Sequence, residues 1–130
     1  MNRLREMLAT KQGGLPMCVT HENNSCLMLF LQPWQGIEWV LPWSRLESAK
    51  LSHEEQFERI DLQFTNHEVL VLGEKLHWYR EELSLHKISR FKSYPAAYRM
   101  KFQDSDSFIS HLEIRLLAEP DKRPSGGLPF

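Results

Sequence analysis

The fold is decided by residues 57–72, which read FERIDLQFTNHEVLVL. Every second residue from Ile60 to Phe64 is apolar, which is the period of a strand with one buried face. Residues 69–72 are all apolar, as expected for a strand that is covered on both faces. Asn66-His67 lies between the two runs, and Asn tolerates the positive φ that a tight reversal needs. We therefore predict a β-hairpin here.

Outward from this hairpin, the sequence predicts further strands. Runs that are apolar or alternate between apolar and polar residues, and that end at turn residues, occur at 17–20, 26–31, 37–43 and 98–102. Residues 108–117 alternate as well and are a late strand or a helix. Pro42 has no N–H to donate, so its strand ends there or lies at a sheet edge. Residues 48–56 are polar and predict a loop.

Two amphipathic segments predict helices. After Gly73, which should end the second hairpin strand, apolar residues recur at i, i+3 and i+7 within residues 74–83. Whether this helix continues through 84–91 stays open, because the apolar phase shifts there. Near the N-terminus, apolar residues at i, i+3 and i+4 from Leu4 predict a short helix over 2–12. A Ser-x-x-Glu pattern at 44–47 predicts one helical turn.

These elements predict an α+β fold. It is an antiparallel β-meander of about five to seven strands, curved or barrel-like, packed with one main helix after the central hairpin and with the short N-terminal helix. Residues 1–117 are expected to form one domain. Residues 118–130, which contain three prolines and two glycines without an apolar period, are expected to be a flexible tail.

Composition narrows the class of protein. The chain has 130 residues, 25% of them charged, and a formal net charge of -1, so no global field attracts nucleic acid or an anionic membrane. No stretch has the length of a membrane span, and the N-terminus lacks the apolar centre of a signal peptide, so we expect a cytoplasmic protein. Cys18 and Cys26 flank a turn-rich segment, and a hairpin would place them opposite each other. We expect free thiols, because reducing compartments disfavour disulfides.

Motifs for catalysis and metal binding are absent from the sequence. No two of the six histidines have the spacing i, i+2 or i, i+4, and there is no Cys-x-x-Cys, Gly-x-Ser-x-Gly or phosphate-binding glycine loop. We therefore expect no cofactor, no metal and no enzymatic activity. A small metal-dependent hydrolase with ligands from dispersed histidines remains an alternative, and the candidates are His21, His53, His67, His77, His86 and His111.

Three of the four tryptophans, Trp34, Trp39 and Trp43, lie within ten residues. If Trp39 and Trp43 point inward they belong to the core. Trp34 follows a proline in a turn, is hard to bury there, and is a candidate anchor for a protein partner, since tryptophan is enriched at interfaces. The three residues are our candidate interaction site.

The stretch 84–103 contains five basic residues and no acidic one. Aromatic residues are interleaved with these charges, a mixture that can bind phosphates or stack bases. The same pattern is also typical of the outer face of an amphipathic strand. The candidate anionic-ligand residues are Lys87, Arg90, Lys92, Arg99 and Lys101.

The sequence thus predicts a small non-catalytic cytoplasmic protein that acts through protein–protein contacts, with a homodimer as one form of that contact. A nucleic-acid or anionic-ligand binding module that uses residues 84–103 is the first alternative, although nucleic acid is the less expected partner. The metal-dependent hydrolase is the second. No membrane partner is expected.

Overall fold

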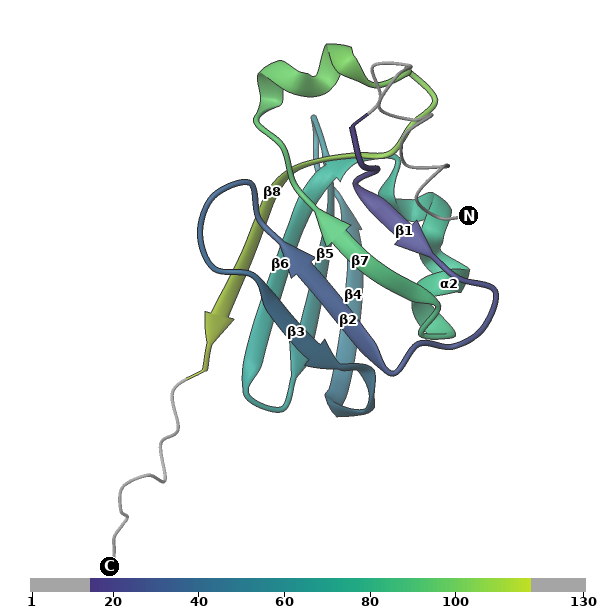
Figure 1. Ribbon diagram of the computed structural model, residues 1–130, viewed down its shortest axis with the longest axis vertical. Helices are drawn as coiled ribbons and strands as arrows, with labels where there is room; N and C mark the ends of the chain where they lie inside the picture. Colours follow the sequence, from purple (N-terminus) through teal and green to yellow (C-terminus); the bar gives the residue numbers. More distant parts are fainter. Residues whose placement is uncertain (1–14, 118–130) are drawn as a thin grey trace, which may run out of the picture.

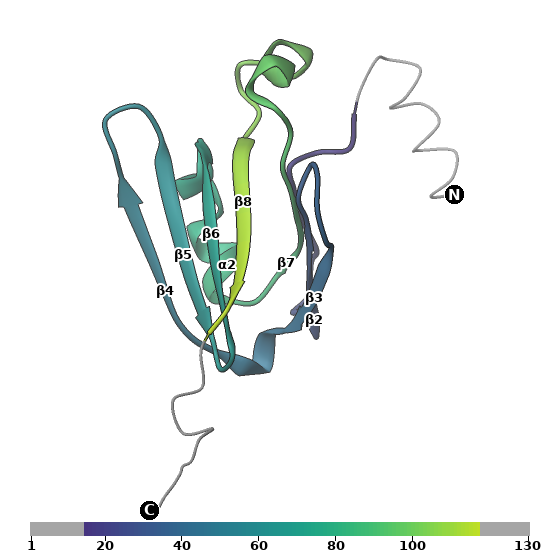
Figure 2. The same ribbon diagram turned by 90° about the vertical axis from the view of Figure 1, so that its left-hand side faces the viewer.

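The computed structural model describes residues 15–117, in which eight strands form two four-stranded sheets that face each other (Figure 1 and Figure 2). Sheet A has the strand order β1 (Val19–His21), β7 (Ile88–Lys92), β2 (Met28–Gln32) and β3 (Trp39–Pro42). Sheet B has the order β4 (Leu46–His53), β5 (Glu58–Phe64), β6 (His67–Glu74) and β8 (Phe108–Leu116).

Short helical segments carry the chain between the sheets. The 3-10 turn η1 (Trp43–Arg45) leads from sheet A to sheet B, and η2 (Leu76–Tyr79) with helix α2 (Arg80–Ser84) leads back. A third 3-10 segment, η3 (Ala96–Lys101), joins β7 to β8. In both views η2 and α2 lie along one side of the sandwich, between the edges of the two sheets. None of the described helices is long and apolar enough to cross a membrane.

The central hairpin is confirmed, but its turn is Thr65-Asn66, because His67 already belongs to β6, and neither turn residue has the expected positive φ. Strands β5 and β6 pair antiparallel, with Ile60 opposite Val71 and Leu62 opposite Val69, and these four side chains are buried. The prediction that both faces of the second strand are covered is wrong, since Leu70 is only half-buried. The end at Gly73 is also wrong, because β6 continues through it to Glu74.

The core lies between the inner faces of the two sheets. Sheet A contributes alternating residues of β2 and β3, and sheet B contributes alternating residues of β5 and β6; η2 and α2 add Leu76 and Leu83. Full burial of one such aliphatic or aromatic side chain stabilises the fold by about 1.5–3 kcal/mol. The largest fully buried side chains are Trp43, Tyr94, Phe64, Phe91 and Phe108.

The α+β class with one main helix is confirmed, but the meander and the barrel-like closure are wrong. The described strands form two separate sheets, and β7 lies between β1 and β2. The β2–β7 pair is parallel, which requires the long connection through sheet B and α2. Because β7 separates β1 from β2, the expected hairpin with Cys18 opposite Cys26 does not form. Both thiols are free, Cys18 buried and Cys26 half-buried.

Several local predictions are corrected. Residues 48–56 contain most of strand β4 rather than a loop, and its polar sequence reflects its place at the edge of sheet B. Residues 98–102 belong to η3 and its end instead of a strand. The helix expected over 74–83 is shorter, beginning as η2 and continuing as α2, and 84–91 enters strand β7. The turn near residue 44 is η1, without a side-chain cap.

Other predictions hold. Residues 108–117 are the strand β8, and Pro42 ends β3, an edge strand of sheet A. β2 lies inside its sheet as expected, although Phe30 on its outer face is exposed. The predicted N-terminal helix over 2–12 and the tail 118–130 lie outside the described residues.

Candidate functional site

A surface hollow of about 510 Å³, which we call the Trp34 pocket, lies where the β2–β3 loop, the end of β7 and strand β8 meet. It therefore joins elements of both sheets. Its lining combines aromatic rings and prolines with a few polar groups, from Pro33, Trp34, Gln35, Ser93, Tyr94, Pro95, Ser110, His111 and Leu112.

Backbone hydrogen bonds fix the position of Trp34. Pro33 presets φ for the turn after β2, and Gly36 takes a φ of +114° that L side chains rarely adopt. The Trp34 N–H donates to Ser93 Oγ at 2.9 Å, and the Ser93 N–H donates to the Gln32 carbonyl oxygen at 3.1 Å. The loop is thereby fastened to the end of β7, and the indole is held in place although it is 43% exposed.

Tyr94 forms the floor of the pocket. Its side chain is 1% exposed, its N–H donates to the Ile109 carbonyl oxygen at 3.0 Å, and its hydroxyl donates to the Pro16 carbonyl oxygen at 2.6 Å. Burial raises the pKa of the Tyr94 hydroxyl to about 12, so the group stays neutral and serves as a donor. Tyr94 thus anchors the site and is not a reactive phenolate.

Aromatic rings extend from the floor to the rim. The centroid of the Trp34 ring lies 5.8 Å from that of Tyr94 and 5.0 Å from that of Tyr98, and the two tyrosine rings are stacked at 5.9 Å. Phe102 continues the row at 5.2 Å from Tyr94. Such pairs contribute about 0.5–1.5 kcal/mol beyond the area they bury. The cluster keeps the exposed indole in one orientation.

Two lysines lie beside this cluster. Lys92 Nζ is 5.3 Å from the Tyr94 ring centroid, and Lys101 Nζ is 5.7 Å from the Tyr98 ring centroid. Both distances fall within the range of cation–π attraction. The structure therefore adds positive charge next to an aromatic surface, as the pattern in residues 84–103 indicated for part of that stretch.

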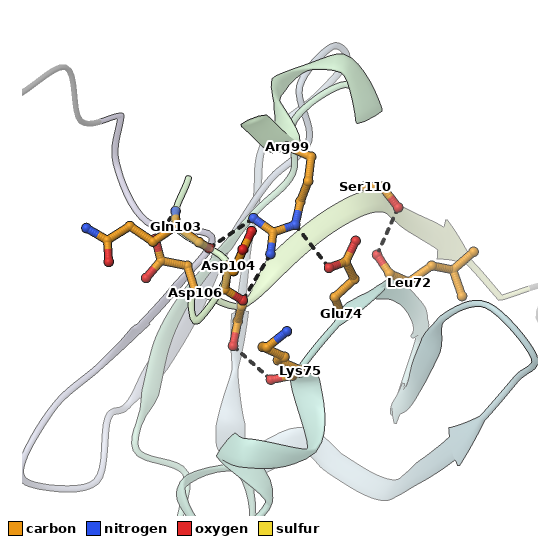
Figure 3. Close-up of polar contacts among 9 residues, drawn as sticks. Leu72, Glu74, Lys75, Arg99, Gln103, Asp104, Asp106 and Ser110 are labelled. Atoms are coloured by element: carbon orange, nitrogen blue, oxygen red, sulfur yellow. Dashed lines mark hydrogen bonds and ion pairs between the residues drawn. The ribbon is translucent and has the colours of Figure 1, made fainter. Parts of the chain in front are cut away.

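Arg99 has a structural role (Figure 3). Its guanidinium donates through Nε to Glu74 Oε1 at 3.0 Å, through Nη1 to the Gln103 carbonyl oxygen at 3.0 Å, and through Nη2 to the Asp104 carbonyl oxygen at 3.2 Å. Asp106 accepts from the Gln103 N–H in the same loop. Arg99 thus ties η3 and the loop after it to the end of β6.

The other basic candidates lie elsewhere. Arg90 is on β7, opposite Phe30 of β2 and Thr20 of β1, and its Nη2 donates to Thr20 Oγ1 at 3.3 Å. Lys87 precedes β7, where its carbonyl oxygen accepts from the Glu22 N–H. The five predicted residues are therefore distributed over the loop before β7, strand β7 itself and η3.

The three predicted tryptophans have three different environments. Trp43 is 1% exposed, and its Nε1 donates to the Ile88 carbonyl oxygen at 2.8 Å, so it belongs to the core. Trp39 is half-buried on β3, with its ring edge-on to His67 at 4.9 Å. Only Trp34 of the three lies in the pocket.

The histidines are also dispersed. His77 Nδ1 lies 2.8 Å from Glu58 Oε1, and His111 Nε2 lies 3.2 Å from Glu113 Oε1. Burial of Glu58 works to raise its pKa, but hydrogen bonds from the His77 ring and from two backbone N–H groups outweigh it, and the net pKa is lowered. Within residues 15–117, no three His, Cys, Asp or Glu side chains are placed to hold a metal ion.

Three polar side chains of the pocket lining already have partners within the chain. Ser93 Oγ accepts from the Trp34 N–H, Ser110 Oγ donates to the Leu72 carbonyl oxygen at 3.5 Å (Figure 3), and His111 is paired with Glu113. The hydrogen bonds of the described residues do not join either serine to His111. The arrangement offers an aromatic surface, prolines, and donors and acceptors at the rim.

A search of protein-family models, of curated proteins and of solved structures found no match to this chain. The site is therefore interpreted from its own geometry. Sequence reasoning identified Trp34 and noted the aromatic residues near Tyr94, but it missed the link between them and the contribution of β8. The only local signal was a proline beside each aromatic residue, in Pro33-Trp34 and Tyr94-Pro95.

Proposed function

We propose that this protein is a non-catalytic interaction module that binds an extended, proline-containing segment of a partner protein in the Trp34 pocket. The observation that supports this best is an indole that is 43% exposed yet packed against the Tyr94 and Tyr98 rings. Tryptophan is enriched among residues that dominate binding energy. A ring that is already ordered loses little conformational entropy on binding.

The shape and chemistry of the pocket favour a proline-containing segment. Such segments form polyproline II helices, whose backbone is not hydrogen-bonded internally, and they dock in grooves lined by aromatic rings. Trp34, Tyr94, Pro33 and Pro95 supply the apolar lining. The amide of Gln35 at the rim is a donor for the free carbonyl groups of such a segment.

The charges around the pocket favour acidic residues next to the prolines. Lys92 and Lys101 lie beside Tyr94 and Tyr98, at the edge of the aromatic cluster. Complementary charge at a rim raises association rates and selects partners more than it raises affinity. We therefore expect salt to slow association with an acidic proline peptide and to affect a neutral one less.

The test uses two synthetic ten-residue proline peptides, one neutral and one flanked by glutamates, titrated by calorimetry into the full chain. A glycine-serine peptide of the same length is the control ligand. Trp34→Ala should weaken binding by about 30-fold, as expected for a hot-spot residue. Trp78→Ala is the matched control variant, because Trp78 is 61% exposed on η2 with Lys75 beside its ring, away from the pocket.

Binding of the proline peptides that is no tighter than that of the control peptide would contradict the proposal. So would equal affinities for wild type and Trp34→Ala, with both folds verified by thermal unfolding. A single-stranded oligonucleotide at low salt is measured in parallel. If it binds more tightly than either peptide, and binding depends on Arg90 and Lys92, the function is nucleic-acid binding instead.

A further inference from the structure

Strand β8 forms an edge of sheet B on the side of the sandwich opposite α2, and in Figure 2, which looks onto this side, none of the described elements lies in front of it. In an antiparallel ladder, the backbone groups of successive residues point alternately toward the paired strand and away from it. The Leu117 N–H donates to the Asn66 carbonyl oxygen at 2.9 Å, so residue 117 points toward β6. The N–H and C=O groups of Leu112, Ile114 and Leu116 therefore point away from β6.

This edge is open over residues 112–116, which span about 16 Å. Within residues 15–117, no backbone hydrogen bond outside the β6–β8 ladder involves this stretch. The edge is occupied only further back, where the Tyr94 N–H donates to the Ile109 carbonyl oxygen at 3.0 Å. Edge strands are usually shortened, blocked by proline or covered, and β3 on the same side of the sandwich is short and ends at Pro42. The edge of β8 is left with unpaired donors and acceptors.

The surface beside the open edge is apolar. The inner face of β8 carries the buried Leu112, the half-buried Ile114 and Leu116, which is 65% exposed. Across the gap to sheet A lies Trp39 of β3, whose ring is edge-on to His67, the residue paired with Leu116. A strand added to this edge would place every second side chain among these apolar groups.

The outer face of the same stretch is charged. Glu113 and Arg115 alternate with the apolar residues, and their side chains lie 3.5 Å apart. Opposite charges on directly facing residues of neighbouring strands attract each other. An added strand with a cation opposite Glu113 and a carboxylate opposite Arg115 would match this face.

The open edge leads directly into the Trp34 pocket, because Leu112 belongs to both. Beyond the pocket the edge is already occupied by Tyr94, so an added strand has to leave the ladder there. A residue opposite His111 would point its backbone N–H away from β8, and proline, which has no N–H, loses no hydrogen bond at such a position. The ladder thus ends where the pocket offers proline an aromatic lining.

We propose that the partner segment bound in the Trp34 pocket continues as a fifth strand of sheet B, paired antiparallel with residues 112–116. The inference rests on the proposed function and adds the conformation and direction of the partner. Antiparallel pairing is slightly more stable than parallel pairing, and every strand pair of sheet B is antiparallel. In this direction the partner has alternating apolar and polar residues first and proline after them. Its backbone supplies hydrogen bonds, and its alternate side chains supply specificity.

The experiment compares acetylated peptides by calorimetry with the full chain. The parent peptide is Val-Glu-Val-Lys-Val followed by three prolines, with the valines opposite the outward-pointing residues of β8. It should bind about tenfold more tightly than the neutral proline peptide, because ladder hydrogen bonds are added. N-methylation of the three valines should remove this gain. N-methylation of the glutamate and lysine is the matched control and should change affinity by less than about twofold, since those N–H groups point away from β8.

Amide hydrogen exchange shows directly which groups are paired. Binding of the parent peptide should slow exchange of the Leu112, Ile114 and Leu116 amides by about tenfold or more. The amides of Glu113 and Arg115 already belong to the ladder with β6, so their exchange should change little. A peptide with the prolines first and the strand residues reversed should bind about tenfold more weakly than the parent peptide.

A protein variant tests the same edge. Leu116→Pro removes an outward N–H from an exposed position, where an edge strand tolerates proline, and it should weaken binding of the parent peptide by about tenfold. Ala49→Pro is the matched control on β4, the other edge of sheet B. The Glu54 N–H donates to the Phe57 carbonyl oxygen, so by the same alternation the Ala49 N–H points away from β5. Thermal unfolding verifies the fold of both variants.

Equal affinities of the parent peptide and the valine-methylated peptide, or unchanged exchange of the three amides in the complex, would overturn the proposal. If the neutral proline peptide still binds and still depends on Trp34, the proposed function stands and only the fifth strand is refuted. If no peptide binds, both are refuted. Sedimentation gives the remaining outcome. A wild type that dimerises with these three amides protected in the absence of peptide, and a Leu116→Pro variant that stays monomeric, would assign the edge to a second copy.

Discussion

Replacing Gly73 with alanine is expected to destabilise the fold strongly. Gly73 lies inside β6, opposite Ile109 of β8 and next to a register shift in their pairing. A Cβ at this position would overlap the carbonyl oxygen of Phe108 and lie 3.0 Å from the Cα of Ile109. Both atoms belong to the backbone of the neighbouring strand, so no side-chain rotation relieves the overlap.

The expected loss of stability can be worked out from the backbone groups that the new Cβ would displace. If β6 and β8 separate locally, about two ladder hydrogen bonds are weakened, at about 1 kcal/mol each. Displacing packed neighbours costs a further 1–3 kcal/mol or so, typical of overpacking. Alanine has a lower conformational entropy than glycine in the unfolded chain, which offsets about 0.5 kcal/mol of this loss of stability. The free energy of unfolding of Gly73→Ala should therefore fall by about 3 kcal/mol.

The assay is urea unfolding followed by tryptophan fluorescence, to which the buried Trp43 contributes. With a slope of about 1–3 kcal/mol per molar urea, the midpoint should fall by about 1–3 M. Gly36→Ala is the control, because a Cβ there meets no atom within 4 Å and only its φ of +114° is unfavourable. That strain costs roughly 1–2 kcal/mol. A loss for Gly73→Ala no larger than for Gly36→Ala would refute the steric argument.

Two further predictions concern titratable groups. Because the pKa of Glu58 is lowered in the folded state, its stabilising effect is complete above the unfolded pKa of about 4.3 and is lost as pH falls through the folded pKa. Glu58→Gln should cost about 1 kcal/mol at pH 7, and the difference from wild type in thermal unfolding should shrink steadily as the pH falls below the unfolded pKa of Glu58. A difference that stays constant over this range would contradict the pairing with His77. Burial raises the pKa of Cys18 to about 11. Iodoacetamide should therefore label the half-buried Cys26 first in the native protein, as measured by mass spectrometry. Equal labelling of the two cysteines would contradict the burial of Cys18.

The central hairpin could be predicted because its signals are local. The two-residue turn and the alternation from Ile60 to Phe64 are sufficient to define it, and the observed register places Ile60 opposite Val71. The edge position of β3 could also be predicted, because Pro42 lacks a donor. In both cases the information lies within a few neighbouring residues.

The strands β4 and β7 could not be predicted, for different physical reasons. β4 is an edge strand with polar side chains along most of its length, so it has no apolar period. β7 is short, and its two core residues, Ile88 and Phe91, are three positions apart, a spacing that also fits a helix. β7 forms only through partners far away in the sequence, such as Phe30 on β2. The local sequence pattern therefore does not indicate that pairing.

The candidate site shows the same limit. The exposure of Trp34 followed from its place in a proline turn, but its contacts with Tyr94 and Tyr98 join segments about sixty residues apart. The alternation at 98–102 predicted a strand with its charges on one face. The chain forms η3 there instead, and only this turn brings the Tyr98 ring beside the indole. The contacts that hold Trp34, with Ser93, Tyr94 and Tyr98, all depend on tertiary structure.

The pocket arises where the two sheets approach without closing. Along one side of the sandwich, η2 and α2 fill the space between the sheet edges with buried leucines. At the pocket, the Tyr94 N–H donates to the Ile109 carbonyl oxygen and links β7 directly to β8, while the Trp34 loop stands beside them. A ligand in the pocket therefore contacts a loop of sheet A and a strand of sheet B together. Since such a ligand would bind only when the sheets are correctly placed, it should stabilise the fold by an amount that increases with its concentration relative to Kd.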